Sequence, residues 1–88
     1  MMTFKVITTG KLTGAIYDFP EIGDVLPMHS HSDADNHISI VVMGSFRVHS
    51  TSGWEATAYA GEVLDWQPND PHEFVALESG SKLVNIVK

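Results

Sequence analysis

The stretch Pro27-Met28-His29-Ser30-His31, with His37 six residues further on, is the most informative part of this sequence. Far downstream, Pro71-His72 adds a fourth histidine. Two histidines separated by one residue lie on the same face of a β-strand, because strand side chains alternate with period two. At about 3.3 Å rise per residue, their Cβ atoms are roughly 6–7 Å apart, close enough for both rings to reach one ion. A metal site inside a β-barrel, shared by the four histidines, is therefore our leading interpretation.

The rest of the sequence is patterned as short strands separated by turns. Runs rich in β-branched and aromatic residues end at Gly, Pro, Asn, Asp or Ser, and no window shows sustained apolar spacing at the helical period. The predicted strands cover residues 4–9, 12–19, 25–29, 37–43, 45–50, 54–59, 63–66, 72–77 and 82–87. We expect a bulge at Gly14, inside the second strand. Short strands with turn signals at this density are typical of an all-β barrel or sandwich.

Length, charge and cysteine content narrow the classes of protein to be considered. A chain of 88 residues predicts one domain, residues 1–88, with a single and marginal core. The net charge of −6, with only five Lys and Arg residues, argues against nucleic acid or an anionic membrane surface as a partner. The chain has no cysteine, which excludes a thiolate metal site and leaves imidazole and carboxylate ligands. No apolar run is long enough for a signal peptide or a membrane span, so we expect a cytoplasmic protein.

The histidine spacing resembles the first motif of the cupins, the RmlC-like superfamily of small β-barrels. That motif has a glycine, five residues, His-x-His, three or four residues, a glutamate, six residues and a closing glycine. Gly23, His29 and His31 match its first half. Counted back from the closing Gly44, His37 occupies the glutamate's position, and it comes one residue later than usual after His31.

The second cupin motif is similar to the segment from Gly61 to His72. It has roughly a glycine, five residues, a proline, one residue, a glycine, two residues and a histidine. Gln67 replaces the proline, and Asn69 replaces the second glycine, which is chemically sensible because asparagine tolerates positive φ better than most residues. Ala76 stands where the motif ends in asparagine. The resemblance covers about residues 23–76 and implies a small all-β jelly-roll barrel, the double-stranded β-helix.

The resemblance also implies a divalent metal ion inside the barrel, held by His29, His31, His37 and His72. In the cupins three histidines and a glutamate hold the ion, and here His37 takes the glutamate's place. An imidazole there removes one negative charge, so anionic substrates or hydroxide should bind more readily. Asp35 is an alternative fourth ligand, because it has the family's shorter spacing from His31. The implied metal would be Fe, Mn, Ni, Zn or Cu, since imidazole ligands suit all of these ions and do not determine which one binds.

Strand alternation also predicts roles for residues outside the histidine set. His49 alternates with core-facing positions and is expected on the surface, as is Glu73 beside His72. Asp65 either faces solvent or accepts a hydrogen bond from the N–H of a ligand imidazole. Five aromatic residues belong to the core, to an interface or to a pocket wall: Tyr17, Phe46, Trp54, Trp66 and Phe74.

Four protein ligands leave one or two positions open on a five- or six-coordinate ion. We therefore expect a metalloenzyme acting on a small oxygen-bearing substrate, an oxidoreductase of dioxygenase or oxidase type first and an isomerase or lyase second. The alternatives are a non-catalytic cupin module that binds a metal or small ligand, and a purely structural barrel. We also expect a homodimer, formed through the amino-terminal strands and the apolar face of Ile38, Ile40 and Val42. No glycine-rich phosphate loop is present, so no nucleotide cofactor is expected.

Overall fold

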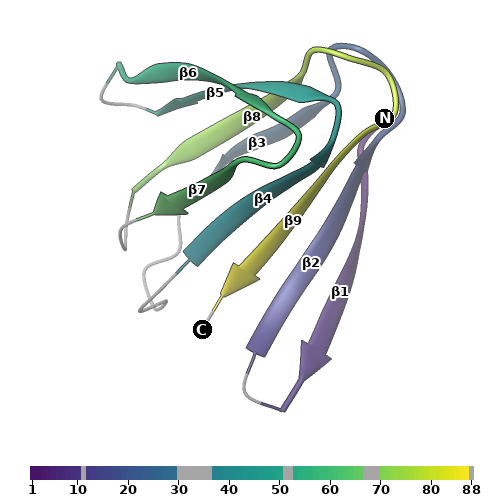
Figure 1. Ribbon diagram of the computed structural model, residues 1–88, viewed down its shortest axis with the longest axis vertical. Helices are drawn as coiled ribbons and strands as arrows, with labels where there is room; N and C mark the ends of the chain where they lie inside the picture. Colours follow the sequence, from purple (N-terminus) through teal and green to yellow (C-terminus); the bar gives the residue numbers. More distant parts are fainter. Residues whose placement is uncertain (11, 30–36, 51–52, 67–69, 88) are drawn as a thin grey trace.

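The chain is built of β-strands, as shown by a computed structural model that describes residues 1–10, 12–29, 37–50, 53–66 and 70–87 (Figure 1). The strands within these ranges are β1 (Thr3–Thr9), β2 (Leu12–Phe19), β3 (Val25–His29), β4 (His37–Met43), β5 (Ser45–Ser50), β6 (Glu55–Tyr59), β7 (Val63–Trp66), β8 (His72–Ala76) and β9 (Ser81–Val87). Each predicted strand is confirmed, with bounds that agree to within one residue. The same ranges contain no helix that is long and apolar enough to cross a membrane.

The strands pair into two antiparallel sheets that face each other (Figure 1). The five-stranded sheet has the order β1-β2-β9-β4-β7, and the four-stranded sheet has the order β3-β8-β5-β6. Chain neighbours β3 and β4, and also β6 and β7, lie in different sheets, so the chain crosses repeatedly between them. This crossing brings the first residues of β4 and β8, His37 and His72, to the same end of the barrel.

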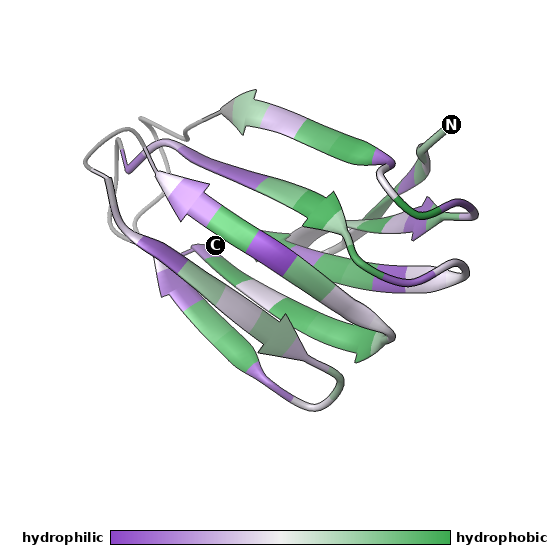
Figure 2. Ribbon diagram, turned by 90° about the horizontal axis from the view of Figure 1, so that it is seen from above, coloured by the Kyte–Doolittle hydropathy of each residue, from purple (hydrophilic) through white to green (hydrophobic). Residues whose placement is uncertain are grey.

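The core lies between the two sheets and follows from strand alternation. Buried apolar side chains recur at every second position, as at Phe46 and Val48 of β5 and at Phe74 and Ala76 of β8. Figure 2 shows hydrophobic and hydrophilic residues following one another along several strands. Phe46 of β5 makes edge-to-face contacts with Phe19 and Phe74, at centroid distances of 4.8 and 5.8 Å, and all three rings are fully buried. Burying each such ring stabilises the fold by about 2–3 kcal/mol, so these rings contribute much of the stability of so small a barrel.

Glycines permit two close approaches between strands. The predicted bulge at Gly14 is wrong, because the residue pairs in regular register with Ile7 on one side and Ile86 on the other. A Cβ atom at Gly14 would lie 2.9 Å from the carbonyl oxygen of Asn85, so glycine is needed here for close approach. Gly44 has a φ of +75°, and a Cβ there would collide with the side chain of Ser81. The register shifts lie elsewhere, between Leu26 and His29 and between Val41 and Met43.

Candidate metal centre and adjoining pocket

His72 is the first residue of β8 and is buried, with 1% of its surface exposed. Its backbone lies opposite Ser50 of β5 and opposite His29 of β3. Alternation places its ring on the same inward face as Phe74 and Ala76, which are also buried. The imidazole therefore belongs to the interior of the barrel.

His37 reaches the same place from the opposite sheet. It is the first residue of β4, pairs in register with Trp66 of β7 and Val87 of β9, and is 3% exposed. Its ring centroid lies 5.1 Å from that of His72, with 45° between the ring planes. The two imidazoles are thus neighbours in a largely water-free interior, although 34 positions separate them along the chain.

The neighbouring backbone determines which nitrogen of His72 carries the proton. Nδ1 of His72 lies 2.7 Å from the carbonyl oxygen of Asp70, and a carbonyl oxygen only accepts hydrogen bonds. Nδ1 therefore donates, and in the neutral ring the lone pair resides on Nε2. A ligating histidine commonly makes this bond with its non-ligating nitrogen, which fixes the tautomer and the direction of the ring.

Trp66 packs directly on His72. The indole and imidazole are nearly parallel, with centroids 4.0 Å apart and 9° between the planes. Nε1 of Trp66 donates to the hydroxyl of Ser39 at 3.0 Å, and that hydroxyl donates to Oδ1 of Asn85 at 2.6 Å. These three residues are buried on β7, β4 and β9, so one polar chain crosses three strands and ends on the ring that covers His72.

The donor set that the structure describes is compatible with a metal ion but is not complete. For a bond of about 2.1 Å from nitrogen to the ion, and an angle near 90–110° between two such bonds, the imidazole centroids would lie about 4.5–5.2 Å apart. The 5.1 Å between His37 and His72 falls in this range. Among the described residues, no three His, Asp or Glu side chains come together as a metal site.

The remaining predicted ligands fall outside what the structure describes. The backbone of His29 is placed at the end of β3, opposite His72, but its side chain is not among the described parts. His31 and the alternative ligand Asp35 also lie outside the described residues. The prediction of a site formed by His29, His31, His37 and His72 therefore stays a prediction, and the structure describes the side chains of only His37 and His72 among the four.

Residues predicted to lie away from the site do so. His49 faces the outside of the four-stranded sheet, where Nε2 lies 2.6 Å from a carboxylate oxygen of Glu73. Asp65 is exposed and alternates with the buried Trp66, which decides its role in favour of solvent. Of the five aromatic residues, Phe46 and Phe74 belong to the core, Tyr17 is half-buried beside it, and Trp54 and Trp66 line a pocket.

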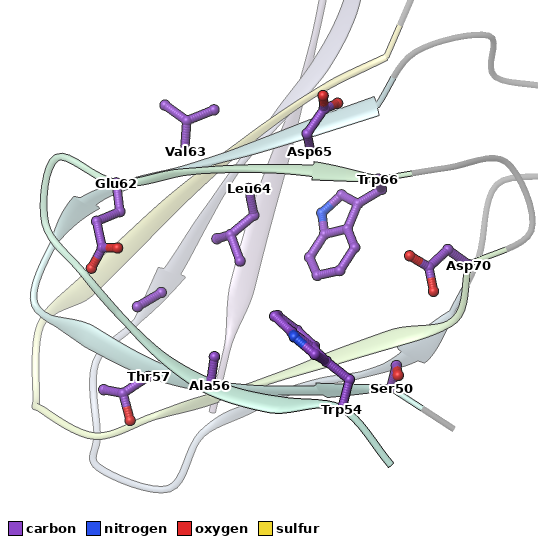
Figure 3. Close-up of a pocket in the computed structure, with 11 residues that line it drawn as sticks. Ser50, Trp54, Ala56, Thr57, Glu62, Val63, Leu64, Asp65, Trp66 and Asp70 are labelled. Carbon is purple, nitrogen blue, oxygen red and sulfur yellow. The ribbon is translucent and has the colours of Figure 1, made fainter. Parts of the chain in front are cut away.

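That pocket opens between β6 and β7, where the two sheets diverge, and encloses about 530 Å³ (Figure 3). Ala56 and Ala58 form one wall and Leu64 the facing wall. At one end, Trp54 meets Trp66 edge to face, with centroids 5.9 Å apart and planes at 87°. Trp66 thus takes part both in the pocket and in the stack on His72. A volume of this size is typical of a small-molecule site.

Sequence reasoning missed the polar chain, and it named Trp54 and Trp66 as possible pocket-wall residues without locating the pocket. Ser39 and Asn85 each stand at a buried inward position next to an apolar one, Val41 on β4 and Leu83 on β9. A buried polar residue requires a hydrogen-bond partner, so these two positions were the available signal. The register of β4 with β7 and β9 identifies the partners, and no local pattern predicts that register.

Comparison with known proteins supports the fold assignment. No family model and no curated protein matches the chain. Among solved structures, KdgF from Halomonas sp. superposes with a TM-score of 0.84 at 25% identity, over 98% of this chain and 76% of that one. An uncharacterized conserved protein from Klebsiella pneumoniae with a double-stranded β-helix domain gives 0.85 at 17% identity, over 98% and 75%.

A third solved structure adds the name of the fold. An RmlC-like cupin from Desulfovibrio desulfuricans superposes with a TM-score of 0.82 at 22% identity, over 98% of this chain and 81% of that one. The chain therefore spans about three quarters or more of the length of these three structures. The two facing antiparallel sheets and these likenesses together show that the chain folds as a small cupin domain, a double-stranded β-helix.

Proposed function

We propose that this cupin domain binds one divalent metal ion through His29, His31, His37 and His72. The observation that carries the proposal is the buried pair of His37 and His72, one from each sheet, with ring centroids 5.1 Å apart. Neutral imidazole nitrogens are good ligands for divalent transition-metal ions. One cation bound between these two rings would be held from both sheets at once.

The surrounding residues suit this role. The carbonyl oxygen of Asp70 accepts the Nδ1 proton of His72, so the neutral ring is the tautomer with its lone pair on Nε2, which is the form that a metal ligand needs. Trp66 covers one face of the same ring and excludes water from it. A four-histidine set carries no charge of its own, so the full +2 of the ion would act on whatever binds beside it.

We further propose that the domain is an enzyme, acting on a small oxygen-bearing molecule such as an enol or a diketone. A divalent ion would supply Lewis-acid chemistry, or electron transfer if it is Fe, Mn or Cu. The protein would orient the substrate against the histidine pair and keep bulk water away, as the buried surroundings of His37 and His72 suggest. Oxidase or dioxygenase chemistry is our first choice, and isomerase or lyase chemistry is our second.

Elemental analysis of the purified protein tests metal binding directly. We expect about one equivalent of a transition metal in the natural chain and a loss of most of it in His72→Ala and His37→Ala. His49→Ala is the matched control, because His49 pairs with Glu73 on the outer face and should leave the metal content unchanged. Metal-free protein after reconstitution, or equal loss in the His49 variant, would contradict the proposal.

Oxygen consumption then separates an enzyme from a binding module. A redox-active metal with O₂ uptake on enol or diketone substrates supports the oxidoreductase. An inert ion such as Zn, with conversion of the substrate and no O₂ uptake, supports the isomerase or lyase. Tight retention of an inert ion with no turnover supports a non-catalytic metal-binding module, and overturns the enzyme while keeping the metal site.

A further inference from the structure

The pocket between β6 and β7 has the size and wall chemistry of a ligand site in its own right. It encloses about 530 Å³, and two perpendicular indoles form one of its ends. Trp54 is 45% exposed, although its neighbour Trp66 is buried. In Figure 3 the ring of Trp54 extends into the pocket toward Trp66. A half-exposed indole in a concave site can present its π-face to a ligand. Because the ring is already held against its neighbour, its side chain loses little further conformational entropy when the ligand binds.

The charges around this pocket are of one sign. Glu62, Asp65 and Asp70 are among its lining residues, and none of the described lining residues is Lys, Arg or His. In Figure 3 the carboxylate of Asp70 faces the two indoles, while that of Asp65 lies on the opposite side of β7. Glu62 stands at the far end, where it accepts a hydrogen bond from the backbone N–H of Tyr59 at 2.7 Å. Asp70 is thus the carboxylate next to the aromatic end of the pocket.

Indole faces and a carboxylate together attract cations. The π-face of tryptophan is the strongest of the aromatic side chains for an ammonium group, and a nearby carboxylate adds a Coulomb attraction. An anionic ligand would face Asp70 with no basic residue among the described lining residues to compensate. A neutral ligand of the same shape would gain only the apolar contact.

We propose that this pocket binds an organic cation of the ammonium class, with the charged group against Trp54 and beside the carboxylate of Asp70. Among the described residues, the pocket adjoins the candidate metal centre at Trp66, at Asp70, whose carbonyl bonds to His72, and at Ser50, whose backbone lies opposite His72. The proposal does not depend on a bound metal, so it is tested with EDTA present. Its failure would leave the metal proposal intact, and the reverse also holds.

Three probes of nearly the same shape and different charge provide the test. They are choline, the neutral 3,3-dimethylbutan-1-ol and the anionic 3,3-dimethylbutanoate, each titrated at constant ionic strength while tryptophan fluorescence is recorded. We expect choline to bind more tightly than the neutral alcohol by about fivefold or more, and the anion to bind most weakly. Equal affinities for choline and the alcohol, tighter binding of the anion, or no binding of choline at millimolar concentration would overturn the proposal.

Variants locate the binding and control for misfolding. Asp70→Asn keeps the side-chain shape and the backbone carbonyl, so it should abolish most of the preference for choline over the alcohol. Asp65→Asn removes one negative charge from the outer side of β7 and should leave the preference unchanged. Trp54→Leu should weaken choline several-fold more than the alcohol, because it removes the π-face but keeps apolar contact. An equal loss of preference in the Asp65 and Asp70 variants would attribute the effect to net charge and overturn the site.

Discussion

The indole of Trp66 and the imidazole of His72 lie parallel, 4.0 Å apart, although they come from strands of opposite sheets. Through this stack, the ring orientation of His72, a candidate metal ligand, depends on how the two sheets pack against each other. Nε1 of Trp66 is itself held by Ser39, whose hydroxyl is bonded to Asn85. The orientation of His72 is thus determined from both sides, by the carbonyl of Asp70 along the chain and by Trp66 across the barrel.

Ser39→Ala should destabilise the protein more than an ordinary serine substitution. The change removes the acceptor of the Trp66 N–H and the donor to Asn85, and leaves both partners buried. Each unsatisfied buried group costs about 1–3 kcal/mol, so for two such groups we expect a loss of about 2–6 kcal/mol in the free energy of unfolding. Urea denaturation followed by far-UV circular dichroism measures this loss.

Ser45→Ala is the matched control for this prediction. The hydroxyl of Ser45 donates to Glu78 at 2.7 Å in a part-buried position, where water can replace the lost partner. We expect Ser45→Ala to lower the free energy of unfolding by about 1 kcal/mol or less. Similar losses in the two variants would show that the polar chain beneath Trp66 adds nothing beyond a single hydrogen bond.

Chelation should lower the melting temperature of metal-loaded protein. An ion that binds only the native state, at a free concentration about 100-fold above its Kd, stabilises the fold by about 2.7 kcal/mol. For a chain of this length each kcal/mol shifts the melting temperature by about 4–8 °C, so EDTA should lower it by roughly 10–20 °C. Differential scanning calorimetry measures the shift. His72→Ala should show no EDTA effect, and an unchanged melting curve in protein shown to contain metal would contradict the prediction.

The strand pattern was predictable because it is local. The run His37–Met43 is β-prone along its whole length and ends at Gly44, whose positive φ stops the strand, and both limits appear in the structure. The prediction for Gly14 was wrong because the contact that requires glycine there is not local. Its role is to let the carbonyl of Asn85 approach, and that neighbour lies on β9, far along the chain.

The candidate site was predictable only in part. His37 and His72 could be paired because motif spacing places both at strand starts, and the structure brings their rings together. The choice between His37 and Asp35 as fourth ligand stays a prediction, although the buried position of His37 supports it. The stack of Trp66 on His72 needs the lateral order of the strands, which a single sequence does not contain.

Tyr17 should make stability depend on pH in the alkaline range. Burial raises the pKa of the Tyr17 phenol above its ordinary value of about 10, and the side-chain amide of Asn85 partly offsets this. The unfolded chain therefore loses this proton first as pH rises. The contribution is fully present below about pH 10 and is lost as the pH rises through the folded-state pKa.

Comparison of wild type with Tyr17→Phe isolates that contribution, because lysines titrate in the same range. We expect the wild type to lose stability more steeply than the variant above about pH 10, in urea unfolding measured at several pH values. The exposed Tyr59 provides the control, and Tyr59→Phe should follow the wild type. Parallel curves for wild type and Tyr17→Phe would show that burial of this phenol has no consequence for folding.

The outer face of the five-stranded sheet carries a band of apolar side chains, and we propose that a second copy of the chain covers it. The register aligns Ile16, Val84, Ile40 and Val63 in one row across four strands. The adjacent row contains Ile7, Gly14, Ile86, Ile38 and Asp65. A patch of this extent is unusual on a monomer surface. Lys5 at the β1 edge ends the first row and Asp65 at the β7 edge ends the second, so a two-fold axis parallel to the strands would bring these opposite charges to the same border of the interface, one row apart, which favours a self-complementary pair.

Light scattering during size exclusion at tens of micromolar should therefore give twice the mass of the chain. Ile40→Glu places a charge at the centre of the apolar rows and should yield a monomer, since an unpaired charge buried in an interface costs several kcal/mol. Thr57→Glu puts the same charge on the exposed outer face of the other sheet, at β6, and should leave the dimer intact. A monomeric wild type would refute the dimer. If Thr57→Glu dissociates the dimer and Ile40→Glu does not, the interface is on the four-stranded sheet. A new charge disrupts the dimer only when it lies on the face that the second copy covers.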